Sequence, residues 1–167
     1  MKKPWNLVNV PVYSIATMHE KSVNMNICTY VSAVSMKPKR YMVAIYHHTK
    51  THEIASKYGV FVLQLLSDIQ HGLIKNFGQK SGIEVDKHAF LMRKNKPNSP
   101  NNAYSVFEWE DHLVLKNCVA IIKMKTIQII PAGDHDMFLC DVVAYKNLND
   151  APILDLNVLR SKKLIRI

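Results

Sequence analysis

Residues 24–53 read NMNICTYVSAVSMKPKRYMVAIYHHTKTHE and hold two polar clusters on either side of an apolar strand. Small polar side chains alternate with apolar ones at the start of this stretch, and a turn at Lys37-Pro38 follows. Tyr41–Tyr46 is apolar throughout, which favours a strand buried on both faces. The basic, hydroxyl-rich residues His47–Thr51 then open a helix. Hydroxyls, backbone N–H groups and a lysine in that position can hold a phosphate.

Length and composition indicate a globular protein. The 167 residues fit one domain spanning residues 1–167, and 48% of them are hydrophobic, too many for a disordered chain. No apolar run approaches the roughly 18 residues of a transmembrane helix. Lys2 and Lys3 resemble the start of a signal peptide, but Asn6 and Pro11 interrupt any apolar segment after them. We therefore expect a cytoplasmic protein without a membrane segment.

The net charge of +9 comes from 22 Lys and Arg residues against 13 Asp and Glu residues. Such a balance suits anionic partners: nucleic acid, acidic lipid or phosphorylated small molecules. The positive charges are dispersed, however, and the densest cluster stands at the C-terminus, at Arg160, Lys162, Lys163 and Arg166. A solvated tail explains that cluster, and no aromatic RNP-type motif or helix-turn-helix pattern accompanies it. We therefore do not expect nucleic acid as the main partner.

Three cysteines are present, at Cys28, Cys118 and Cys140. They are odd in number, widely spaced and without a CxxC pair, so neither a zinc knuckle nor a thioredoxin motif is indicated. We expect reduced thiols, mostly buried in strands.

Alternating and apolar runs predict a mainly β fold. Expected strands are Val12–Met18, Val23–Ser35 (a strand or an extended loop), Tyr41–Tyr46, Val60–Leu66, Val106–Trp109, Leu113–Ile130 (one strand or two with a bend) and Met137–Lys146. Expected helices are one capped by Thr49 or Thr51 that ends before Gly59, one over Asp68–Phe77 that follows a Ser67/Gln70 capping box, and a short turn over Asp86–Phe90. Pro131–Asp136 should form a tight turn, and the tail from Ala151 should be extended, anchored by Val158 and Leu159. Six or more strands with two helices between them predict a closed or nearly closed antiparallel barrel.

Three motifs in this order resemble the flavin reductase-like family of FMN-binding split barrels. The first is Asn26–Ser35 followed by Met36-Lys37-Pro38, similar to the small polar segment that leads into V-S-x-x-P. The second is Val43–Ile54, similar to the phosphate-side loop and helix start. The third is Gly133-Asp134-His135 before Met137-Phe138, similar to the G-D-H-x-x-F hairpin. The resemblance runs from about Pro11 to Asp150 and implies an antiparallel, Greek-key-like split barrel.

The resemblance also implies function. It implies a homodimer with FMN near the subunit interface, NADH or NADPH as hydride donor, and a partner oxygenase or other electron acceptor. The residues that it places at the flavin ring are Asn26, Ile27, Cys28 and Thr29; those at the phosphate are Ser32, Thr49, Lys50 and Thr51; and His135 lies near the flavin or the nicotinamide. The chain departs from the family pattern at His47–Thr51, where Ser-Ser-Arg is common, and at Lys37-Pro38-Lys39, where Asp-Pro-Pro is common.

Each of these residues has an alternative role. His135 can be a solvated turn residue, Ser32 and Ser35 can be strand hydroxyls on a wet face, and Cys28 can be a buried apolar group. His48 and His52 have the i, i+4 spacing of a helical metal pair, but no HExxH pattern is present, so the sequence predicts no metal site.

Three functions are compatible with this pattern. The first is an NAD(P)H-dependent flavin reductase. The second is a flavoredoxin-like FMN electron carrier without nicotinamide activity. The third, of a different class, is a small basic barrel that binds single-stranded nucleic acid.

Overall fold

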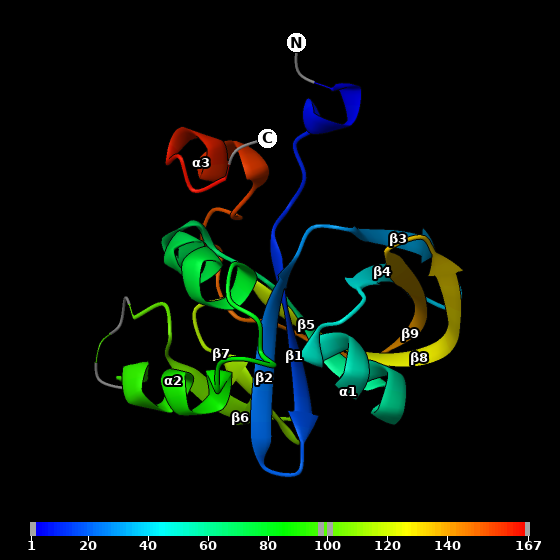
Figure 1. Ribbon diagram of the computed structural model, residues 1–167, viewed down its shortest axis with the longest axis horizontal. Coiled ribbons are helices and arrows are strands. Elements are labelled where there is room, and N and C mark those ends of the chain that lie inside the picture. The colour runs from blue at the N-terminus through cyan, green and yellow to red at the C-terminus, as the bar shows by residue number, and fades with distance from the viewer. Residues whose placement is uncertain (1–2, 97–98, 100–101, 166–167) are drawn as a thin grey trace.

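Seven antiparallel strands form one strongly curled sheet in the order β2-β1-β5-β8-β9-β4-β3, and β6 and β7 form a separate hairpin (Figure 1). The computed structural model describes residues 3–96, 99 and 102–165. The strands are β1 Tyr13–His19, β2 Ser22–Cys28, β3 Val31–Ser35, β4 Arg40–Tyr46, β5 Val60–Leu65, β6 Val106–Trp109, β7 His112–Leu115, β8 Ala120–Ala132 and β9 His135–Asn147.

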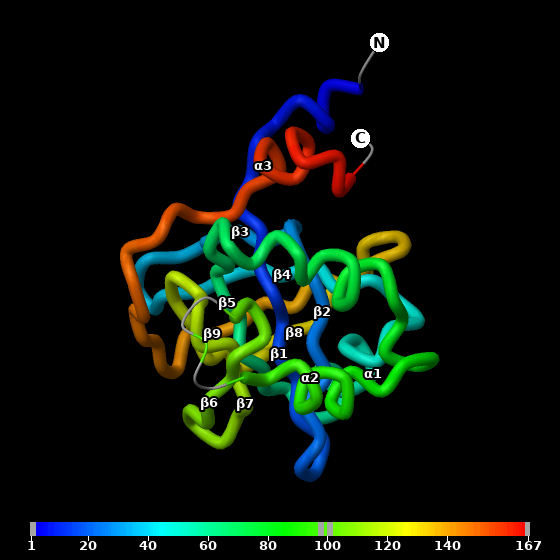
Figure 2. The backbone as a smooth tube through the Cα atoms, turned by 90° about the vertical axis from the view of Figure 1, so that its left-hand side faces the viewer, coloured from blue at the N-terminus to red at the C-terminus, as the bar shows by residue number. Residues whose placement is uncertain are grey.

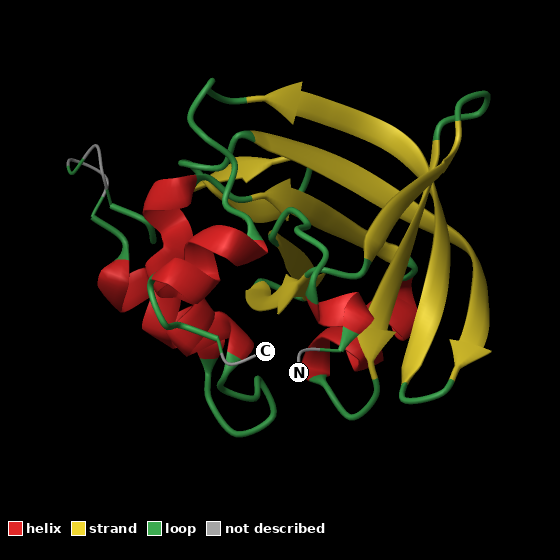
Figure 3. Ribbon diagram, turned by 90° about the horizontal axis from the view of Figure 1, so that it is seen from above, coloured by secondary structure: helices red, strands yellow, loops and turns green. Residues whose placement is uncertain are grey.

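The helical segments are short, and most of them gather on one side of the curled sheet (Figure 3). They are the α-helices α1 Lys50–Tyr58, α2 Lys87–Lys94 and α3 Leu156–Ser161, the 3₁₀-helices Pro4–Asn6 and Asp68–Gly72, and the π-helix Ile74–Gly78. Within the described part of the chain, no helix has the length and apolar character needed to cross a membrane.

β1 and β5 are neighbouring interior strands of the sheet and are buried on both faces. Their side chains alternate between two apolar clusters: Ile15 and Leu63 belong to one, Ala16 and Val62 to the other. The cluster with Ile15 lies between the sheet and α1, and we call it the barrel core. The cluster with Ala16 lies between the sheet, α2 and the β6–β7 hairpin. Burial on two faces requires apolar residues at consecutive positions, as these strands have.

The two longest strands, β8 and β9, close the curl. Their ladder contains irregularities between Lys123 and Met124 and between Thr126 and Gln128. Such bulges bend a strand and increase its twist, which lets one strand pair follow the sheet around the barrel core. The neighbours β1–β5, β5–β8 and β9–β4 are not consecutive in sequence. The structure therefore confirms the predicted mainly β split barrel with its Greek-key-like connections.

Local signals predicted the ends of several elements correctly. Thr49 caps α1, where its side chain accepts a hydrogen bond from the His52 N–H, and Gly59 ends the helix at a φ of 67°. Ser67 and Gln70 form the predicted capping box. All three cysteines are free and buried, as predicted.

Three strand predictions require correction. Val23–Ser35 is divided after Cys28 into β2 and β3, which lie at opposite edges of the sheet. Leu113–Ile130 forms two strands, which is one of the two predicted alternatives, but β7 and β8 belong to different sheets and are not one bent strand pair. Tyr41–Tyr46 is not buried on both faces: Val43 and Ile45 enter the barrel core, whereas Tyr46 is 48% exposed. The continuous apolar run predicted burial of both faces, but other parts of the chain pack only against the inner face of β4.

The helical predictions also differ from the structure in three places. Asp68–Phe77 is not one α-helix, since the backbone changes from 3₁₀ to π hydrogen bonding between Gly72 and Ile74. The predicted turn at Asp86–Phe90 is the start of the longer helix α2, which Asp86 caps. The predicted turn over Pro131–Asp136 is shorter in the structure and consists of Gly133-Asp134. β8 extends to Ala132, and β9 begins at His135.

The C-terminal segment, predicted to be extended, contains α3. Asp155 is its N-cap and accepts hydrogen bonds from the Val158 N–H at 2.9 Å and from Asn9 Nδ2 at 3.0 Å. Leu159 is buried, as expected of an anchor, and Arg160 donates to the Asn6 carbonyl at 2.6 Å. These contacts hold α3 against the N-terminal segment, as Figure 2 shows. Arg166 of the basic cluster lies outside the described residues.

Helix α2 covers the open edge of β2. Lys87 is 6% exposed, and its ammonium group donates to the carbonyl oxygens of Met25 in β2 and Phe77 in the π-helix, both at 2.9 Å. The Val23 N–H donates to His88 Nδ1 at 3.3 Å. An uncovered edge strand leaves backbone donors and acceptors unpaired. These two side chains pair some of them and tie β2 to the segment after β5.

Replacing Asp155 by Ala should lower the free energy of unfolding by about 1 kcal/mol, the typical value of an N-cap. Asp155→Asn should lose less, because asparagine also caps helices well. Urea denaturation of both variants measures the difference. Equal losses in the two variants would contradict the capping role of Asp155.

Burial lowers the pKa of Lys87 from 10.5 to about 8. Between these two pH values the unfolded chain holds a proton that the folded chain has released, so stability rises with pH across this window. Relative to Lys87→Met, the wild type should therefore gain stability as the pH rises from about 8 toward 10.5. Denaturation at several pH values measures this gain. Lys94→Met, at the exposed end of α2, is the control, and a pH-independent difference for Lys87→Met would count against the assignment.

Candidate functional site

Two adjoining pockets lie where β2 and β4 approach the start of α1. The first, about 220 Å³, we call the lysine pocket; it is lined by Asn24, Asn26, Tyr46, His48, Thr49, Lys50, Thr51, Gly78, Gln79, Lys80, Ser81, Gly82 and Lys87. The second, about 120 Å³, we call the strand pocket; it is lined by Ile15, Asn26, Ile27, Cys28, Thr29, Tyr30, Ala44, Ile45, Tyr46 and His135. Asn26 and Tyr46 line both, so the two pockets adjoin.

The N-terminus of α1 forms one wall of the lysine pocket. Thr49 is extended (φ −107°, ψ 148°), accepts a hydrogen bond from the His52 N–H and donates its own to the Tyr46 carbonyl at 2.9 Å. A helix N-terminus presents backbone N–H groups and the positive end of the helix dipole, which favour an anion. Lys50 in the first turn adds a full positive charge at the same place.

The opposite wall is the segment GQKSG, residues 78–82, between the π-helix and α2. A Cβ atom at Gly82 would collide with the side-chain oxygen of Asn24, so only glycine fits there. Asn24 is buried and donates from Nδ2 to Thr51 Oγ1 at 2.8 Å, while its Oδ1 has no hydrogen-bond partner. A buried polar atom without a partner, at the wall of a pocket, suits a ligand that donates a hydrogen bond.

The lysine pocket has a positive electrostatic character. Lys50, Lys80 and Lys87 line it, and no carboxylate is found among its described lining residues. Burial and two carbonyl partners already constrain Lys87, and desolvation lowers its pKa to about 8. An anion in the pocket would stabilise the charged form of this ammonium group.

The strand pocket combines apolar side chains with polar groups, which come from Asn26 of β2, from Thr29 and from His135 of β9. Asn26 Oδ1 accepts a hydrogen bond from the neighbouring Ile27 N–H at 2.8 Å. Cys28 points into the barrel core, and burial raises the pKa of its thiol to about 12. The thiol is therefore protonated at neutral pH, which agrees with its expected role as a buried apolar group.

His135 closes the strand pocket together with two tyrosines. Its ring centroid lies 5.3 Å from that of Tyr30 and 5.2 Å from that of Tyr46. His135 Nδ1 lies 2.6 Å from a carboxylate oxygen of Asp134, and this hydrogen bond lowers the pKa of Asp134. The carboxylate and the rings together fix the imidazole over the pocket.

The structure brings together every predicted site residue except Ser32. Asn26, Ile27, Cys28, Thr29 and His135 line the strand pocket, and Thr49, Lys50 and Thr51 line the lysine pocket. The Thr51 hydroxyl, however, is buried against Asn24.

Ser32 lines neither pocket. It pairs with Met42 in the β3–β4 ladder, away from the end of β4 where Thr49 follows, and its hydroxyl donates to the Ala33 carbonyl at 3.4 Å. The phosphate contact expected of Ser32 therefore stays a prediction, and neither pocket includes this residue.

The His48–His52 pair does not form a helical pair, because His48 has a φ of 58° and precedes α1. His48 lines the lysine pocket instead, and His52 contacts Asp136, with 2.7 Å between Nε2 and Oδ2.

Sequence reasoning missed Asn24, Lys80, Gly82 and Lys87. Within residues 79–102 the sequence predicts only the short turn over Asp86–Phe90, although two glycines flank a basic, hydroxyl-containing triplet in GQKSG. That pattern, typical of a loop that approaches an anion, was the available signal.

Comparisons with solved structures support the fold. The chain is similar to an FMN-binding protein from Thermus thermophilus, with 21% identity and a TM-score of 0.73 over 88% of this chain and 75% of that one. It is similar to flavoredoxin from Methanosarcina acetivorans, with 18% identity and a TM-score of 0.71 over 88% and 74%. It is also similar to the styrene monooxygenase flavin reductase from Pseudomonas putida, with 17% identity and a TM-score of 0.70 over 89% and 87%.

No curated protein matches the sequence. The family model described as the flavin reductase like domain matches residues 5–160, which is nearly the whole chain. The resemblance seen in the three motifs is thereby confirmed, and the chain belongs to the flavin reductase-like domain family.

Proposed function

We propose that this chain is an FMN-dependent oxidoreductase of the NAD(P)H:flavin reductase type, which supplies reduced flavin or electrons to a partner. The observation that carries the proposal is that the lysine pocket and the strand pocket adjoin, because Asn26 and Tyr46 line both. The lysine pocket suits a phosphate, and the strand pocket, with both apolar and polar groups, suits a heteroaromatic ring at the other end of the same ligand. Membership of the flavin reductase-like family supports this reading.

The phosphate would lie in the lysine pocket. There the first-turn N–H groups of α1 supply hydrogen-bond donors, and Lys50 and Lys80 supply positive charge. Ser81, on the opposite wall, offers a further hydroxyl. The residues present therefore fit a phosphate dianion, even though this chain departs from the common family pattern at His47–Thr51.

The sugar-alcohol chain of FMN would follow the wall between the two pockets. The partnerless Asn24 Oδ1 can accept a hydrogen bond from a hydroxyl group, and it packs so closely against Gly82 that a side chain at that position would collide with it. This is the second point at which the residues fit the cofactor.

The ring would lie against the β2 segment Asn26–Thr29. FMN, when bound, accepts a hydride from a nicotinamide and passes electrons on, and the protein contributes position and electrostatics. Cys28 stays a neutral thiol, so it places no charge next to the ring. His135, held by Asp134, Tyr30 and Tyr46, is in place to contact the ring or the nicotinamide and to hold a proton on its free nitrogen.

A partner oxygenase is the proposed electron acceptor, because one similar structure is the flavin reductase of a styrene monooxygenase. A flavoredoxin-like electron carrier is the second candidate, favoured by the similarity to a flavoredoxin. The two differ in whether a nicotinamide is the electron donor.

Purified protein should be yellow, or take up added FMN, and should release FMN on denaturation. Consumption of NADH or NADPH that depends on flavin is expected for the reductase. A yellow protein that leaves both nicotinamides unoxidised would instead support the flavoredoxin-like carrier. A protein that takes up no flavin would overturn both.

Lys50→Met should weaken FMN binding roughly ten- to hundredfold, because a charge-assisted hydrogen bond contributes roughly 1.5–3 kcal/mol. Lys57→Met, on the last turn of the same helix, is the matched control and should leave the affinity unchanged. Flavin fluorescence titration gives both dissociation constants. Equal affinities for the two variants would place the phosphate elsewhere.

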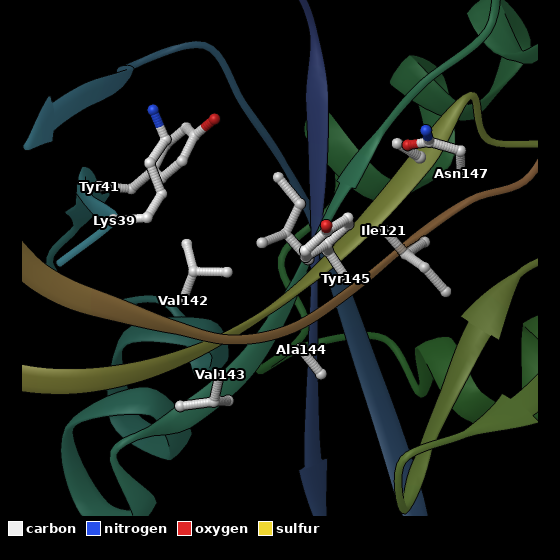
Figure 4. Close-up of a pocket in the computed structure, with 10 residues that line it drawn as sticks. Lys39, Tyr41, Ile121, Val142, Val143, Ala144, Tyr145 and Asn147 are labelled. Atoms are coloured by element: carbon white, nitrogen blue, oxygen red, sulfur yellow. The ribbon is translucent and has the colours of Figure 1, made fainter. Parts of the chain in front are cut away.

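We also propose that the chain forms a homodimer, and the family resemblance implies that the flavin lies near its interface. A groove of about 710 Å³ runs across β4, β9 and β8 (Figure 4), and its side chains are mainly apolar. Lys39 and Tyr41 lie side by side on one wall, with the ammonium 5.5 Å from the ring centroid. Val143 is 50% exposed and Tyr145 is 74% exposed in the single chain. Exposed apolar surface of this kind marks interaction sites.

Tyr145→Glu should therefore convert a dimer into a monomer, because it places a charge in the proposed interface. Size-exclusion chromatography with light scattering measures the mass. Tyr58→Glu changes another exposed tyrosine, on α1, and should leave the dimer intact. A wild-type chain that is monomeric at all concentrations would contradict the dimer.

A further inference from the structure

Two histidines and one aspartate converge at the open end of the barrel core. His47 follows β4, His52 lies in the first turn of α1, and Asp136 is the second residue of β9. His47 Nε2 lies 2.9 Å from Asp136 Oδ1, and His52 Nε2 lies 2.7 Å from Asp136 Oδ2. One ligand atom from each residue lies within 4.8 Å of the others. These three residues are called the histidine–aspartate cluster below.

The cluster is separate from the flavin site. In the β4–β9 ladder Tyr46 pairs with His135, and Ile45 pairs with Asp136. Because side chains alternate across a sheet, Asp136 points to the opposite face from His135. None of the three cluster residues lines the lysine pocket or the strand pocket.

The surroundings hold the two imidazole rings in place. The ring of His52 packs edge-on against Phe138 with 5.7 Å between centroids, and the rings of His47 and His52 meet at 5.2 Å. The His47 N–H donates to the Asp134 carbonyl at 3.0 Å, which continues the β4–β9 ladder by one residue. Asp136 thus lies in a strand, His47 directly after a strand and His52 at the start of a helix. Regular secondary structure therefore positions all three ligand atoms.

We propose that the histidine–aspartate cluster is a zinc site. Two imidazole nitrogens and one carboxylate form a ligand set that zinc accepts, with water in the remaining position. Ligands at about 2.0–2.1 Å from zinc in a tetrahedron are roughly 3.3 Å apart. The two Nε2 atoms contact different oxygens of Asp136, at 2.9 and 2.7 Å, and one ligand atom from each residue lies within 4.8 Å of the others. Rotations of these side chains would bring the three ligand atoms to the spacing that zinc requires. The three side chains are 31%, 22% and 17% exposed, so water can reach the ion.

The alternative is a metal-free cluster in which both imidazoles donate hydrogen bonds to one carboxylate. In that arrangement each Nε2 carries a proton, whereas in the zinc site both Nε2 atoms are deprotonated ligands. The two arrangements therefore predict opposite results for metal binding.

Titration of chelator-treated full-length protein with Zn²⁺ by calorimetry decides between them. We expect one equivalent of zinc per chain and a visible spectrum of tetrahedral character when Co²⁺ replaces it. Asp136→Asn and His52→Gln should each weaken zinc binding at least tenfold. His19→Gln, at the end of β1, is the matched control and should bind zinc as the wild type does.

A measurement on the wild type covers the case in which a variant fails to fold. Zinc should protect His47 and His52, but not His19, from diethyl pyrocarbonate, as mapped by mass spectrometry. Absence of stoichiometric zinc binding would overturn the proposal and leave the metal-free cluster. Unchanged affinity in both folded variants, or equal protection of His19, would also overturn it, because the zinc would then be bound elsewhere.

Discussion

The antiparallel ladder between β4 and β9 is the interaction on which both sites depend. It pairs Arg40 with Asp141 at one end and Tyr46 with His135 at the other, and the Arg40–Asp141 ion pair, at 2.8 Å, accompanies the first pair. A slip of one residue would exchange the two faces of the sheet. The register therefore decides that His135 closes the strand pocket while Asp136 points toward the barrel core.

The cover over the edge of β2 is the second constraint. Lys87 and His88 of α2 bond to backbone groups of β2, and Asn26 bonds to the next N–H along the same strand. The same α2 residues bring GQKSG, residues 78–82, close to Asn24. The packing of α2 against β2 thus both covers the strand edge and forms one wall of the lysine pocket. The proposed phosphate position depends on this packing.

The parts of the fold that the sequence predicted well are those set by neighbouring residues. The Thr49 cap, the Gly59 stop and the Ser67/Gln70 capping box each depend on side chains within a few positions. The division of Val23–Ser35 and the helix in the C-terminal tail were missed. β3 forms because β4 pairs with it, and α3 is held by contacts to the N-terminal segment more than 140 residues away.

For the candidate site, the sequence by itself determined the chemistry of one wall: a capped helix start with Lys50, the polar segment Asn26–Thr29, and His135 after a Gly-Asp turn. Tertiary structure alone decided the other wall, with Asn24, Lys80 and Lys87, and it leaves Ser32 outside both pockets. It also decided that Asp136 meets two histidines. Side-chain type and local spacing can be read along a chain, whereas strand register and the packing of distant segments depend on contacts that spacing does not encode.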